Sequence, residues 1–85
     1  MASLKVGRQL QAARVLAGYD RTQLAKAAGI TSFTVKRLEL QDHISATTST
    51  VDALEKALAE AGVELTGDAD APGVRLRRRP AAGVA

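Results

Sequence analysis

The stretch from Asp20 to Glu39, DRTQLAKAAGITSFTVKRLE, constrains the fold of this chain more than any other part of the sequence. It predicts two short helices joined by a tight turn. Asp20 is a suitable cap for the first helix, and Gln23, three residues later, is placed to complete a capping box. Gly29 suits the positive φ of a sharp turn, and Thr31 is placed to cap the second helix.

The two predicted helices cover Arg21 to Ala28 and Ser32 to Leu40. Ala25 is a small residue four positions before the turn glycine, so the second helix can cross close over the first. Apolar side chains recur at helical spacing and are expected to face the core; they are Tyr19, Leu24, Ala28, Ile30, Val35 and Leu38. Two such helices with such a turn form a helix-turn-helix.

A first helix is predicted from Leu4 to Ala17, and Arg14 falls on its inward apolar stripe. An unpaired interior charge is very costly, so we expect an ion pair between Arg14 and Glu39. Val15 and Leu16 fall off the stripe. They are interpreted either as ordinary surface residues or as a contact with a second subunit.

After a polar loop from Gln41 to Thr48, Ser49 is the expected cap of a fourth helix, with Asp52 at its third position. Its apolar positions are Val51, Leu54, Leu58 and Ala61, and Gly62 ends it. The predicted helical domain therefore spans residues 1–62.

The apolar pattern then changes to alternation, which predicts a β-hairpin over residues 63–77 around the turn TGDADAPG. An isolated pair of strands is marginal in water, so it needs support from the helical core or from another copy of the chain. Residues 78–85 are expected to form a flexible basic tail. The fold class is thus mainly α with a C-terminal hairpin.

Composition narrows the function further. The 85 residues include no cysteine and one histidine, so we expect neither a disulfide nor a metal site, and no cofactor-binding or catalytic motif is evident. An enzyme is therefore not expected. No apolar run is long enough to span a membrane, and we expect a cytoplasmic protein without a membrane partner.

Charge is unevenly distributed along the chain. Residues 1–48 carry a formal charge of +4, residues 49–72 carry −5 and residues 73–85 carry +4. The acidic segment would repel DNA and should face away from it. The arginines of the C-terminal run either contact neighbouring phosphates or form a solvated basic terminus; they are Arg75, Arg77, Arg78 and Arg79.

From about Val6 to Leu58 the sequence resembles the Cro/Xre-like helix-turn-helix regulators, which include the lambdoid phage repressors. The matching elements are Leu24-Ala25, Gly29-Ile30-Thr31 and Val35-Lys36-Arg37-Leu38-Glu39. The resemblance implies a lambda-repressor-like domain of four or five helices. In several members a first-helix arginine pairs with a glutamate that ends the third helix, as Arg14 and Glu39 would here.

The resemblance also implies that the helix from Ser32 lies in the major groove of double-stranded DNA. The implied base contacts are Ser32, Phe33, Lys36 and Arg37, and the implied phosphate contacts are Arg21, Thr22 and Thr31. Arg37 suits guanine and Phe33 suits a thymine methyl group. The family often has glutamine where Arg21 stands.

Phe33 is unusual, since polar residues are commoner at this position in the family. It is interpreted as a methyl reader, as a protein contact, or as a side chain folded against its own helix.

These features predict a small sequence-specific transcriptional regulator, a repressor in the first instance, that binds DNA as a homodimer on a partly palindromic site. The alternative is an antiactivator or antitoxin-like module that binds another transcription regulator. That module would use Val15, Leu16 and Phe33, or the acidic fourth helix and hairpin.

Overall fold

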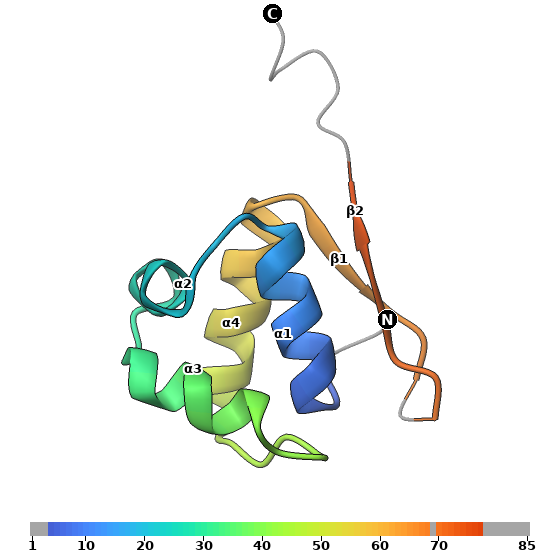
Figure 1. The fold of residues 1–85 in the computed structure, drawn as a ribbon, viewed down its shortest axis with the longest axis horizontal. Helices are drawn as coiled ribbons and strands as arrows, with labels where there is room; N and C mark the ends of the chain where they lie inside the picture. Colours follow the sequence, from blue (N-terminus) through green and yellow to red (C-terminus); the bar gives the residue numbers. More distant parts are fainter. Residues whose placement is uncertain (1–3, 69, 78–85) are drawn as a thin grey trace, which may run out of the picture.

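The computed structural model describes residues 4–68 and 70–77. Within these residues the chain forms four helices and an antiparallel hairpin of two strands, so the fold is mainly helical, as predicted. The elements are α1 (Gly7–Leu16), α2 (Arg21–Ala28), α3 (Ser32–Glu39), α4 (Thr48–Glu60), β1 (Val63–Thr66) and β2 (Gly73–Leu76). Figure 1 shows α2 and α3 on one side of the molecule and the hairpin on the opposite side.

All four helices contribute to one apolar core, and Val63 of the hairpin joins it. The largest fully buried side chains are Leu10, Leu24, Val35, Leu38, Leu54 and Leu58. Their spacing within each helix places one face inward, which is the amphipathic pattern that the sequence predicts. Tyr19, Ala28 and Ile30 pack against this core and are only partly buried.

The turn between α2 and α3 has the local geometry expected from its sequence. Asp20 Oδ1 accepts a hydrogen bond from Gln23 N at 2.7 Å, and Gln23 Oε1 accepts one from Asp20 N at 2.8 Å. Gly29 has φ +73°, which only glycine adopts without strain, and Thr31 Oγ1 accepts from Thr34 N at 3.1 Å. These caps fix the start of both helices.

The boundaries of the other helices differ from the predictions. The first helix begins at Gly7, because the backbone of Lys5 bonds outside the helix: Lys5 O accepts a hydrogen bond from Ile44 N at 2.9 Å. The third helix ends at Glu39, and Leu40 is its C-cap.

The predicted cap of the fourth helix, Ser49, is wrong. Thr47 is the cap and accepts a hydrogen bond from Thr50 N, so Thr48 begins α4. The run TTST offers four hydroxyl side chains of similar capping ability, and local sequence does not choose among them.

The hairpin packs on the helices of its own chain, which is one of the two kinds of support that the sequence left open. Both strands contact α1, and β1 also contacts α4. Val63 pairs with Leu76 and Leu65 with Val74, so the apolar side chains lie on one face. Gln9 Nε2 donates a hydrogen bond to Gly73 O at 3.1 Å and ties β2 to α1. The predicted tail, residues 78–85, lies outside the described residues.

The first turn of α1 packs directly against the end of α3. Gly7 N donates a hydrogen bond to Gln41 O at 3.0 Å. A Cβ atom at Gly7 would lie 2.6 Å from Leu38 O and would also collide with the carbonyl oxygens of Glu39 and Gln41. Glycine is therefore required by space at this position.

Within residues 4–68 and 70–77, none of the helices has the length and apolar character that crossing a membrane requires.

Candidate functional site

The exposed side of α3 is the best candidate for a functional surface. Ser32, Phe33, Lys36 and Arg37 are exposed, and we call these four residues the α3 outer face. The inward positions of the same helix are fully buried, including Val35 and Leu38. One side of this short helix is therefore held by the core, and the other side is presented to solvent.

The two cations of the α3 outer face are available for binding. Among the described residues, no hydrogen bond or ion pair engages the side chain of Lys36 or of Arg37. An unpaired ammonium and an unpaired guanidinium on adjacent positions can donate to phosphate oxygens or to the acceptors of a guanine edge.

Phe33 is 71% exposed, so its side chain is not folded against its own helix. It lies one helical turn before Arg37, and the two side chains therefore share a side of α3. The surface thus combines a large apolar group with an exposed cation.

The ion pair between Arg14 and Glu39 is present. Arg14 Nε donates to Glu39 Oε2 at 2.6 Å, and Arg14 Nη1 also donates to Tyr19 O at 3.1 Å. The Glu39 side chain is 1% exposed, so its carboxylate depends on these partners for stabilisation.

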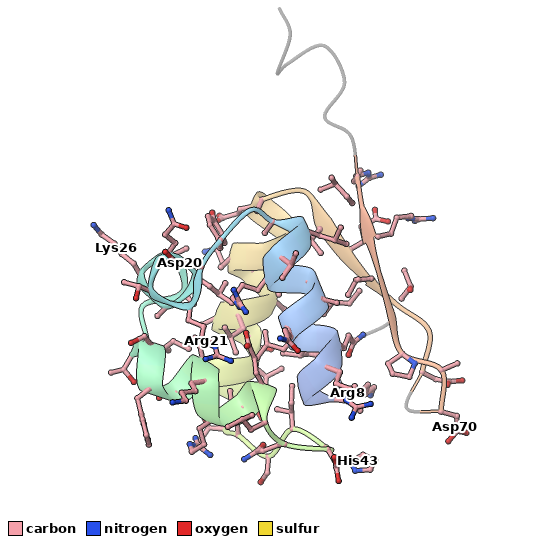
Figure 2. The ribbon with its side chains drawn as sticks, viewed as in Figure 1. Arg8, Asp20, Arg21, Lys26, His43 and Asp70 are labelled. Atoms are coloured by element: carbon pink, nitrogen blue, oxygen red, sulfur yellow. The ribbon has the colours of Figure 1, made fainter. Side chains whose placement is uncertain are left out.

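Arg21 belongs to the same cluster, which the sequence did not reveal. Arg21 Nε donates to Glu39 Oε1 at 3.0 Å, so one carboxylate joins α1, α2 and the end of α3. Figure 2 shows Arg21 between α2 and α3, with Asp20 and Lys26 on the outer side of α2. The Arg21 side chain is still 36% exposed, and its Nη atoms make no hydrogen bond to the described residues.

The other predicted contact residues lie around the start of the two helices. Thr22 is exposed in the first turn of α2, and Thr31 is exposed at the cap of α3. The Thr31 hydroxyl is already used, because it accepts from Thr34 N and also bonds Thr34 Oγ1 at 2.9 Å.

The structure separates the residues of the alternative protein-contact surface. Val15 is 62% exposed and Leu16 is 36% exposed at the C-terminal end of α1. Phe33 lies in the first turn of α3, and Figure 1 shows these two helix ends in different parts of the molecule. The three residues therefore do not form one patch.

Two acidic residues of the hairpin lie away from α3. Asp70 lies at the hairpin turn, on the opposite side of the view from Arg21 and Lys26 (Figure 2). On the hairpin, Glu64 accepts from Arg75 Nε at 2.9 Å and pairs with Arg77 Nη1 at 3.2 Å. The hydrogen bond from Arg75 lowers the pKa of the Glu64 carboxyl group.

No protein-family model matches this sequence, and no curated protein matches it either.

Proposed function

We propose that the protein is a small sequence-specific DNA-binding transcriptional regulator, with α2 and α3 as a helix-turn-helix of the Cro/Xre type. The observation that carries this proposal is the α3 outer face, where two cations without a partner among the described residues project from a helix whose other side is fixed in the core. Such a helix holds the backbone positions of its exposed side chains in a fixed arrangement, which suits major-groove recognition. A cytoplasmic repressor is the form of regulator that we propose.

The proposed base contacts are the four residues of the α3 outer face. Arg37 donates two hydrogen bonds to guanine, Phe33 packs on a thymine methyl, Ser32 bonds a base edge, and Lys36 contacts a base or a phosphate. Arg21, Thr22 and Thr31 lie at helix N-termini, where backbone N–H groups already favour an anion. Pairing with Glu39 supports this role for Arg21, because it orients the guanidinium while leaving the Nη atoms free to donate.

We also propose that the active form is a homodimer. A single domain of this size makes few phosphate contacts and would bind weakly. Two copies related by a two-fold axis would place their α3 helices about 34 Å apart, in successive major grooves on one side of the DNA.

Selection of bound sequences from random duplex DNA tests the proposal. Enrichment of a motif supports it, and a palindromic repeat of that motif supports the dimer. If specific and random duplexes bind equally at low salt, the proposal is wrong.

Arg37→Ala provides the residue-level test. It should reduce the preference for the selected site by about 1–3 kcal/mol, because a bidentate base contact is lost. The measurement is the ratio of binding constants for selected and scrambled duplexes. Lys56→Ala is a matched control, since it removes one exposed cation from α4 and should leave this ratio unchanged.

Arg21→Ala separates phosphate contact from base contact. It should weaken binding to all sequences and lower the salt slope by about 0.9.

The 71% exposure of Phe33 also favours a second candidate, a module that binds another transcription regulator. NMR titration separates the two candidates. DNA-induced shifts at α3 support the regulator, whereas tight binding of a cellular regulator without any response to DNA supports the module.

A further inference from the structure

We propose that the α3 outer face recognises a pyrimidine C5 methyl group next to a guanine. The ligand is a thymine beside guanine or, equally, a 5-methylcytosine beside guanine, so that binding responds to cytosine methylation. This inference rests on the proposed DNA-binding function and adds the chemistry of the site that is read.

Phe33 supplies the apolar contact. Its ring is 71% exposed, although apolar side chains of this size are normally buried, and it contributes nothing to the core. A phenyl ring has no hydrogen-bonding group, so it cannot read the donors and acceptors of a base edge. The apolar feature that the major groove presents is the C5 methyl group of thymine. 5-Methylcytosine carries the same methyl group at the same ring position.

Arg37 supplies the polar contact. It is exposed and unpaired among the described residues. It lies four residues after Phe33, a rise of about 6 Å along the helix. Both side chains lean toward the helix N-terminus, but arginine is the longer of the two, so its guanidinium extends back toward the turn of Phe33. Because stacked bases are only about 3.4 Å apart, the guanidinium and the ring reach neighbouring bases.

The two contacts differ in their chemistry and therefore specify two different base features. Arg37 donates to the O6 and N7 atoms of guanine, whereas the ring of Phe33 excludes water from the methyl group. Neither group can replace the other. The combined ligand is a methyl group and a guanine on adjacent bases.

The test compares duplexes that differ by a methyl group alone. At the thymine beside guanine in the selected site, thymine is replaced by uracil, by cytosine or by 5-methylcytosine. We expect thymine to bind about fourfold more tightly than uracil, and 5-methylcytosine about fourfold more tightly than cytosine, as burial of one methyl group predicts.

Phe33→Ala should bring the thymine-to-uracil and the 5-methylcytosine-to-cytosine affinity ratios to about one. Phe33→Leu should retain most of both preferences. Because Phe33 is exposed, both variants should unfold at the temperature of the wild type, and a thermal melt checks this.

The outcomes separate this inference from the function on which it rests. If a sequence motif is enriched but the paired duplexes bind equally, the inference is wrong and the regulator stands. The inference is also wrong, and the regulator still stands, if the enriched motif has no thymine or methylatable cytosine beside guanine. If no motif is enriched, both are wrong.

Discussion

The α2–α3 side of the molecule and the hairpin both carry basic side chains, but they use them differently. On the hairpin, Arg75 and Arg77 share the carboxylate of Glu64. On α3, Lys36 and Arg37 have no partner among the described residues. Like charges therefore differ in availability: one carboxylate partly offsets the two hairpin arginines, whereas Lys36 and Arg37 have no such counter-charge among the described residues.

The two sides differ in the same way in how firmly they are held. Leu38 of α3 is fully buried, whereas Val74 of β2 is only partly buried. Lys36 and Arg37 therefore project from a helix that a fully buried leucine anchors in the core. Three measurements test this contrast.

The largest effect is expected from Leu38→Ala. It should lower the free energy of unfolding by about 3–4 kcal/mol, because it leaves a cavity under α3. Val74→Ala should cost about 1 kcal/mol, since fewer contacts are lost at a partly buried site. Chemical denaturation measures both values, and equal losses would contradict the difference in packing.

A smaller effect is expected from Glu39→Gln, which should lower the free energy of unfolding by about 2–3 kcal/mol. The substitution leaves Arg14, whose side chain is 14% exposed, facing a neutral amide in a buried position. Arg21→Gln should cost less, because the Arg21 side chain is 36% exposed and water can replace its partner. Thermal or denaturant unfolding gives both values. A larger loss for Arg21→Gln would show that Arg21 is the main partner of the carboxylate.

The smallest effect is the pH dependence of the hairpin ion pairs. The pKa of Glu64 is lowered in the folded state, chiefly by its hydrogen bond with Arg75. Its contribution to stability is therefore complete above the ordinary pKa of a glutamate and is lost as the pH falls through the lowered value. Glu64→Gln should lower stability slightly at neutral pH and have no effect in strong acid. Unfolding curves for wild type and variant across this range check the sign.

Local signals in the sequence were enough to place α2, its capping box and the turn glycine, since each depends on residues within four positions of one another. The alternation of apolar and polar residues is a local signal of the same kind, and it was enough to predict the hairpin of β1 and β2.

Other features depend on the packing of distant segments. The requirement for glycine at position 7 arises from carbonyl oxygens at the end of α3, which no local pattern reveals. Arg21 was predicted only as a phosphate contact, because its distance to Glu39 depends on how α2 crosses α3. Similarly, the loop before Thr47 is tied to a distant segment, because Ile44 N donates a hydrogen bond to Lys5 O ahead of α1.

The side chain of Gln9 has a consequence for the order of folding. Its Oε1 atom accepts from Lys5 N at 2.7 Å, and its Nε2 atom donates to Gly73 O, 64 residues away in sequence. The first bond closes a short loop at little entropic cost. The second closes a loop that contains most of the chain, and its entropic cost is larger. We therefore expect the near partner to orient the amide first, and the hairpin to dock on a helix that is already formed.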